Sequence, residues 1–91
     1  MATSEITVTL LNKVGLHARP ASQFVQTAAR FTSTITVFCG PRKANAKSIL
    51  QVLSLGAAGG KEITIQADGA DADAALDALK QLVADKFGEA E

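Results

Sequence analysis

The sequence predicts an α+β domain in which helices cover one face of a four-stranded antiparallel sheet. Four segments alternate apolar and polar residues with a period of two, as strands with one buried face do. Three other segments place apolar residues at helical spacing. Their order along the chain is β-α-β-β-α-β-α, with short connections. Such a mixture favours antiparallel strand pairing, with helices on one face of the sheet and water on the other.

The first half of the chain supplies a strand and a helix. Residues 5–11, "EITVTLL", alternate apolar residues with threonines, and "NKVG" at 12–15 then predicts a turn. A helix is expected over residues 19–30. Its apolar side consists of Ala21, Val25, Ala28 and Ala29, with Phe24 beside them. Pro20 suits only the first turn, where its missing N–H needs no intrahelical partner, so the helix begins beside His17.

The middle of the chain predicts a strand, an edge strand and a short helix. In "TSTITVFC" the side chains of Ile35 and Val37 point inward and the threonines outward. "GPRK" turns the chain into a short edge strand over residues 42–45. Ser48 is then a natural N-cap for a short helix, which Gly56 can end.

The last part predicts a strand and a long helix. In "KEITIQAD" Ile63 and Ile65 point inward, and Asp71 is the expected N-cap of the final helix. The apolar stripe of that helix consists of Ala75, Leu76, Leu79, Leu82, Val83 and Phe87. Asp73 at the start and Lys80 and Lys86 toward the end match the helix dipole.

Composition limits the classes of function. Nine basic and nine acidic residues balance, which argues against a nucleic-acid or anionic-membrane surface. The single cysteine, Cys39, cannot form an internal disulfide, and this indicates a reducing compartment. No signal peptide and no transmembrane run is recognised, so we expect one domain over residues 1–91 in the cytoplasm.

His17 is the only histidine, and it lies at a predicted helix start in "GLHARPAS". The N-terminus of a helix offers free backbone N–H groups and a partial positive charge, which attract phosphate. The amides of Ala18 and Arg19 should point out of this end, and the Arg19 guanidinium can grip phosphate oxygens. Gly15 allows a sharp bend before the site. The pattern is that of a histidine able to accept a phosphoryl group.

Other interpretations of His17 fit the same residues. A histidine near a helix start is most often a surface cap with no chemical role. A metal site is poorly supported, because one histidine and one distant cysteine make no ligand set. A Ser-His-Asp triad lacks a partner for the imidazole.

The motif "GLHARPAS", together with "KSILQVLSLGAAGG" in mid-chain, closely resembles the histidine-containing phosphocarrier (HPr) family of the bacterial phosphotransferase system. The resemblance covers essentially the whole chain. It implies an open-faced β-sandwich, βαββαβα, with three helices on one face of the sheet, which agrees with the elements expected above. It also implies no cofactor and a stoichiometric carrier in place of an enzyme.

The resemblance implies a role for each residue of the first motif. His17 matches the histidine that takes phosphate on Nδ1 from phosphoenolpyruvate by way of enzyme I and passes it to a histidine of enzyme IIA. Arg19 matches the active-site arginine, Pro20 the proline that sets the helix start, and Ala18 the residue whose amide helps hold the phosphate. The pathway implied is sugar uptake or nitrogen-branch regulation.

The second motif implies regulation and docking. Ser48 matches a serine that a dedicated kinase/phosphorylase modifies in many bacteria, and a transcriptional regulator is a further implied partner. A phosphate at a helix start is favourably placed and adds nearly two negative charges. Ile49 and Leu50 are expected to be partly exposed and to contact partners, whereas Val52 and Leu53 are expected in the core.

Departures from the family pattern leave the pathway open. Gln26 and Ala29 stand where many sugar-pathway members carry lysines. The longer turn before His17 and the ending "LVADKFGEAE" look more like proteobacterial and nitrogen-branch carriers. We expect a monomer.

Two functions from other classes remain as alternatives. A small enzyme acting on acyl phosphates would use Arg19 to grip its substrate and Asn45 to position water, and would turn over acetyl phosphate alone. An inert binding or regulatory module would leave His17 without chemistry and would not label with phosphoenolpyruvate and enzyme I.

Overall fold

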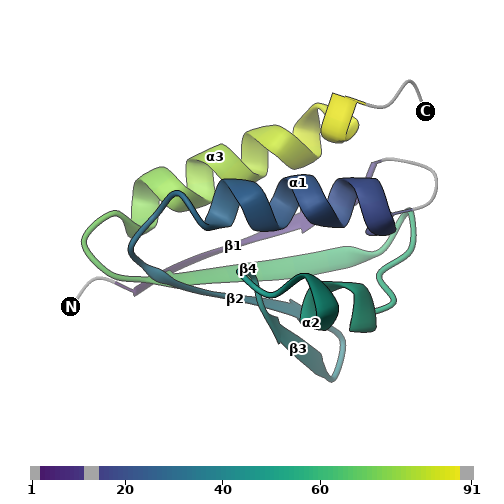
Figure 1. The fold of residues 1–91 in the computed structure, drawn as a ribbon, viewed down its shortest axis with the longest axis horizontal. Coiled ribbons are helices and arrows are strands. Elements are labelled where there is room, and N and C mark those ends of the chain that lie inside the picture. Colours follow the sequence, from purple (N-terminus) through teal and green to yellow (C-terminus); the bar gives the residue numbers. More distant parts are fainter. Residues whose placement is uncertain (1–2, 12–14, 89–91) are drawn as a thin grey trace.

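A computed structural model describes residues 3–11 and 15–88 (Figure 1). The described elements follow the expected order and end in a short 3-10 turn. They are β1 (Thr3–Thr9), α1 (Ala18–Ala28), β2 (Thr34–Cys39), β3 (Arg42–Asn45), α2 (Ile49–Ser54), β4 (Glu62–Asp68), α3 (Ala72–Ala84) and the 3-10 turn (Lys86–Gly88). Most of the turn expected at 12–15 lies outside the described residues.

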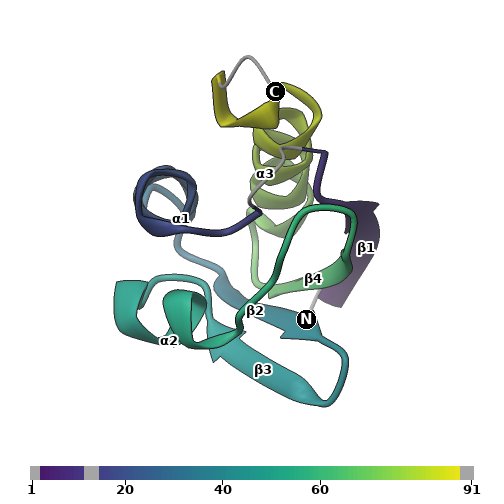
Figure 2. The ribbon, with the colours of Figure 1, turned by 90° about the vertical axis from the view of Figure 1, so that its right-hand side faces the viewer.

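The four strands form one antiparallel sheet in the order β1-β4-β2-β3. Ile65 in β4 stands opposite Ile6 on one side and Val37 on the other, and Val37 stands opposite Ala44. Figures 1 and 2 show α1 and α3 lying across one face of the sheet, with α2 beside α1 next to the β3 edge. The expected α+β fold, with helices on one face, is confirmed.

Alternation along the strands explains which face the helices cover. The residues that fill the space between sheet and helices include Ile35, Val37, Ile63 and Ile65 from the strands and Phe24 and Leu79 from the helices, all at most 1% exposed. The opposite face carries the expected threonines, and the hydroxyls of Thr7 and Thr64 lie 3.0 Å apart across β1 and β4. Cross-strand threonine pairs of this kind stabilise an open sheet face. One layer of helices therefore suffices to build the core.

Several details of the expected helices are wrong. The apolar stripe of the last helix continues to Phe87, but α3 ends at Ala84 and Phe87 adopts a left-handed φ of 56°. This turn still buries the Phe87 ring, so its burial was predicted correctly and its helical conformation was not. Ala29 was placed on the apolar side of the first helix, yet it is exposed as the residue that ends α1.

Asp71 occupies the expected N-cap position of α3, but its side chain does not cap that helix. Its carboxylate instead accepts hydrogen bonds from the backbone and hydroxyl groups of Thr32 and Ser33, which lead into β2. The hydrogen bond from the Ser33 hydroxyl, followed by that from the Thr32 N–H, lowers the pKa of Asp71 to about 2. The aspartate therefore joins the start of one helix to a distant strand.

No helix in the described part of the chain is long and apolar enough to span a lipid bilayer.

Candidate functional site

His17 is the N-cap residue of α1. Its backbone is extended, with φ −92° and ψ −169°, and its carbonyl oxygen accepts the N–H of Ala21 at 2.8 Å as the first helical bond. The imidazole makes no capping hydrogen bond to the first turn and is half-buried. The N-cap side chain of α1 therefore does not cap the amides of the first turn.

The residues that follow His17 make the helix start attractive to an anion. Ala18 and Arg19 are exposed in the first turn, which contains no acidic residue. The backbone N–H groups of a first turn have no intrahelical acceptors, and they carry the positive end of the helix dipole. Together with the Arg19 guanidinium they can hold a tetrahedral oxyanion beside the imidazole.

Gly15 and Leu16 attach this helix start to the connection between α2 and β4. The Leu16 N–H donates to the carbonyl oxygen of Ala57 at 2.8 Å. Gly15 has φ +73°, and a Cβ built on it would lie 2.3 Å from the carbonyl oxygen of Ala57 and 2.5 Å from the carbonyl carbon of Ala58. Only glycine permits both the conformation and this backbone approach. The connection between α2 and β4 thus supports the residue that precedes His17.

Pro20 completes the support as the third residue of α1. It is buried, and Leu16 on the other side of His17 is only 4% exposed. Apolar residues therefore hold the chain on both sides of a half-buried imidazole. The position of Pro20 in the sequence correctly predicted where the helix begins. It did not predict the backing by Ala57 and Ala58, because that contact joins segments distant in sequence.

Ser48 is the N-cap of α2, as expected, and its hydroxyl accepts the Gln51 N–H at 3.4 Å. The helix that it begins presents apolar side chains to solvent: Ile49 is 37% exposed, Leu50 75% and Leu53 37%. The expectation that Leu53 lies in the core is wrong. Val52 and Leu55 fill the core from this segment, so the six-residue helix buries a narrower face than its composition suggests.

The two motifs lie on neighbouring helices. α1 packs beside α2, and the chain following α2 reaches the start of α1 through the Leu16–Ala57 hydrogen bond. At the other end, the Lys47 ammonium, next to Ser48, donates to the Phe31 carbonyl oxygen beyond the end of α1 at 2.7 Å. Figure 1 shows the two helices running in opposite directions.

Asn45 is held in the turn that precedes α2. The Asn45 side-chain oxygen accepts the Lys47 N–H at 2.9 Å, and its backbone oxygen accepts the Ser48 N–H at 3.0 Å. It therefore belongs to the turn that starts α2. Within residues 3–11 and 15–88, no cluster of three or more His, Cys, Asp or Glu residues could hold a metal ion.

Known proteins resemble this chain along nearly its whole length. The family described as "PTS HPr component phosphorylation site" matches residues 4–85. Phosphocarrier protein NPr of Shewanella violacea is 48% identical over 90 residues, 99% of each chain. Phosphocarrier protein HPr of Mycoplasma capricolum subsp. capricolum is 49% identical over 76 residues, which cover 84% of this chain and 85% of the relative.

Solved structures show the same fold. The crystal structure of HPr-C-His from Thermoanaerobacter tengcongensis has a TM-score of 0.93 and 46% sequence identity, and covers 97% of this chain and 99% of that chain. A phosphocarrier protein HPr from Bacillus anthracis has a TM-score of 0.87 at 42% identity, and covers 91% of this chain and 99% of that chain.

Proposed function

The chain belongs to the HPr family of phosphocarrier components of the phosphotransferase system, and on that premise we propose that it carries a phosphoryl group on Nδ1 of His17. The donor is phosphorylated enzyme I, charged from phosphoenolpyruvate, and the acceptor is a histidine of an enzyme IIA protein. The observation that carries the proposal is the start of α1, where the N-cap imidazole stands beside an exposed arginine and a first turn that contains no acidic residue.

The transfer itself needs little from this chain. The imidazole nitrogen of His17 attacks phosphorus, and the new N–P bond forms as the bond between phosphorus and the donor histidine breaks. Ala18 offers a backbone N–H to the phosphoryl oxygens and Arg19 a guanidinium, while Gly15 and Pro20 keep the helix start in place. Because both donors are exposed to water, they stabilise the phosphohistidine only partly, and the group can be passed on.

Incubation with phosphoenolpyruvate, magnesium and purified enzyme I tests the proposal. We expect the intact mass to rise by one phosphate, the label to be acid-labile, and His17→Ala to take up none. Arg19→Met, which keeps the histidine, should label more slowly. A folded protein that takes up no label from several enzyme I proteins, or a His17→Ala variant that labels normally, would overturn it.

Docking of enzyme I and enzyme IIA is assigned to the exposed apolar residues of α2, Ile49, Leu50 and Leu53. A contiguous apolar surface beside a reactive group is typical of a protein-binding surface. Leu50→Asp should slow phosphoryl transfer from enzyme I while the fold is retained. Ala74→Asp adds the same charge at an exposed position of α3 and is the matched control. Equal slowing by both variants would show a general charge effect and remove the docking role.

Ser48 is assigned a regulatory role, as the target of a kinase/phosphorylase of the kind known for this family. Its phosphate would add nearly two negative charges to the surface shared by α1 and α2. We expect this charge to act on the arriving partner. Ser48→Asp should therefore slow transfer from enzyme I, whereas Ser48→Ala should not. Unchanged transfer to Ser48→Asp would contradict the assignment.

A further inference from the structure

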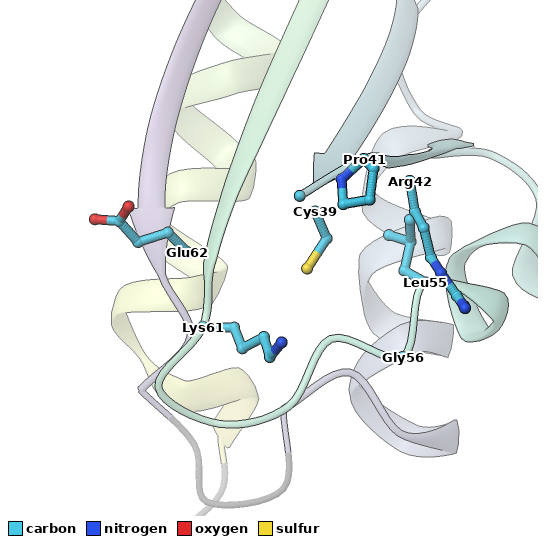
Figure 3. A pocket seen from close by; sticks show the side chains of 8 residues that line it. Cys39, Pro41, Arg42, Leu55, Gly56, Lys61 and Glu62 are labelled. Carbon is cyan, nitrogen blue, oxygen red and sulfur yellow. The ribbon is translucent and has the colours of Figure 1, made fainter.

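The two edges of the sheet differ in how their backbone groups are covered. At the β3 edge the Asn45 N–H donates to the side-chain oxygen of Gln51 in α2 at 2.9 Å. The Arg42 guanidinium donates to the Ser54 carbonyl oxygen at 2.9 Å, and Figure 3 shows this side chain beside Leu55 and turned toward α2. At the other edge, β1 pairs with β4 alone within the described part of the chain. Because an uncovered edge strand can pair with a further strand, β1 is the edge open to a partner.

Alternate residues of β1 direct their backbone groups away from β4. The Leu10 N–H donates to the Lys61 carbonyl oxygen at 2.9 Å, and the Leu10 carbonyl oxygen accepts the Gly60 N–H at 2.9 Å. Both backbone groups of Leu10 therefore face β4. In an antiparallel pair, residues that bond to the neighbouring strand alternate with residues whose N–H and C=O point the other way. The outward groups of β1 belong to Glu5, Thr7 and Thr9.

A groove of about 250 Å³ opens between β1 and α3, beside this edge. The Ser4 hydroxyl donates to the Asp73 carboxylate at 2.8 Å and joins the two walls. Half-buried Ile6 and buried Leu76 give the groove an apolar floor. The volume is below that of pockets that enclose small metabolites, and it suits a few side chains of a chain segment instead. Figure 1 shows the first turn of α3 and the start of β1 at the opposite end of the molecule from the start of α1.

The charged groups along this groove are mostly acidic. Asp73 and Asp77 stand four residues apart on α3, so both carboxylates lie on the same side of that helix. Glu5 adds a third carboxylate on β1, and Lys80 is the one cation in the lining. A second copy pairing its own β1 at this edge would bring like charges together across the two-fold axis. Charge complementarity therefore selects a basic partner and disfavours self-association.

We infer that the edge of β1 binds an extended, lysine-rich segment of a partner protein as a fifth strand of the sheet. The backbone of that segment would pair with the outward N–H and C=O groups of β1. On the side of α3, its lysine side chains would lay their methylene groups over Ile6 and direct their ammonium groups to Asp73 and Asp77. Because the start of α1 lies at the other end of the molecule, this partner would leave His17 accessible.

Titration with a seven-residue peptide of alternating lysine and threonine, the length of β1, tests this inference. We expect saturable amide chemical shifts in β1 and slower hydrogen exchange of the Glu5, Thr7 and Thr9 amides. The same peptide with glutamate in place of lysine should give no saturable shift. Shifts without slower exchange of these amides would show attraction to the carboxylates but no added strand, and would overturn the inference. No saturable shift in β1 with the lysine peptide would also overturn it.

Asp77→Asn tests whether the groove supplies the charge. The substitution removes one carboxylate and leaves the backbone of β1 unchanged, so the lysine peptide should bind about two- to fivefold more weakly, the range for losing one exposed ion pair. Asp85→Asn removes an exposed carboxylate at the end of α3, outside the groove, and should bind like the parent protein. Equal weakening in both variants would show attraction to the overall charge and overturn the inference. Since His17 is unchanged in each variant, the carrier function keeps its own test.

Discussion

The starts of α1 and α3 are attached to the rest of the fold in different ways. At α3 the N-cap carboxylate of Asp71 accepts hydrogen bonds from Thr32 and Ser33 and ties the helix to β2. At α1 the N-cap residue is His17, whose imidazole caps nothing, and the chain is held by the backbone through Gly15 and Leu16. One helix start is tied to a strand by its N-cap side chain, and the other is tied to a loop by its backbone.

The proposed carrier role of His17 accounts for this difference. A histidine that accepts and passes on a phosphoryl group must present its imidazole to its partners. The α1 start is held by backbone contacts with a distant connection, and under that proposal its first turn directs its dipole at the phosphoryl oxygens. Variants at the two starts should separate into those that damage the fold and those that damage only transfer.

Gly15→Ala should have the largest effect on stability. The new methyl would meet the Ala57 carbonyl oxygen at 2.3 Å with φ at +73°, so overpacking adds to left-handed strain. We expect the free energy of unfolding to fall by about 2–5 kcal/mol, measured by urea denaturation. Gly40→Ala is the matched control, because Gly40 has φ +60° but nothing within 4 Å of a Cβ. It should cost only about 1 kcal/mol. Equal losses would mean that the left-handed conformation alone, and not the close approach to Ala57, causes the loss of stability in Gly15→Ala.

Asp71→Asn should show its effect in acid. The pKa of Asp71 is about 2 in the folded chain, against 3.8 for the free group, so the unfolded chain takes up the proton first as the pH falls. The stability that this carboxylate contributes is complete above about pH 4 and is lost as the pH falls toward 2. Asp71→Asn should lower the melting temperature at pH 7 and flatten the loss between pH 4 and 2. Asp77→Asn, an exposed change on the same helix, should keep the acid slope of the parent protein. A parent-like slope in Asp71→Asn would contradict the assignment.

The sequence pattern predicted the fold well because the residues within each segment favour the structure that the segment adopts. Alternation identified the strands, and Pro20 and Ser48 identified two helix starts by local rules that no distant contact overrides. Leu53 was misplaced because α2 has only six residues, of which four are apolar, so helical periodicity cannot tell which side faces the core. Packing against β3 and α1 makes that choice.

Contacts between distant segments account for what the sequence could not predict. Asp71 followed the local rule for an N-cap in position but not in bonding, since Thr32 and Ser33 offer it four donors from 38 or 39 residues away. At the candidate site the identities of His17 and Arg19 were visible in the sequence. The backing of Gly15 by Ala57, and the groove between β1 and α3, exist only once the chain is folded.

Ser48→Ala should lower stability modestly. The start of α2 is intermediate between the starts of α1 and α3, because its N-cap side chain caps the helix but only through a long hydrogen bond. Ser48 caps its own helix, but the distance from its hydroxyl oxygen to the Gln51 nitrogen is 3.4 Å, at the long end for a hydrogen bond. Loss of an N-cap costs about 0.5–2 kcal/mol, and we expect about 0.5 kcal/mol here by urea denaturation. Ser54→Ala, which removes a serine hydroxyl from the other end of the same helix, is the control. A loss of 2 kcal/mol or more in Ser48→Ala would mean that this cap is as structural as Asp71.

Ala18→Pro should change stability least and yet slow transfer. Proline is well suited to the first position of a helix, and the residue before it must be extended, as His17 already is at φ −92° and ψ −169°. The substitution removes one backbone N–H and little else, so unfolding should shift by less than about 0.5 kcal/mol. Phosphoryl transfer from enzyme I should slow about tenfold, less than the loss of an enclosed oxyanion donor because this site is open to water. Ala18→Gly keeps the N–H and should transfer at the parent rate. If Ala18→Pro also transfers at that rate, the first-turn amide is not part of the phosphate site, and Arg19 alone must hold the group beside His17.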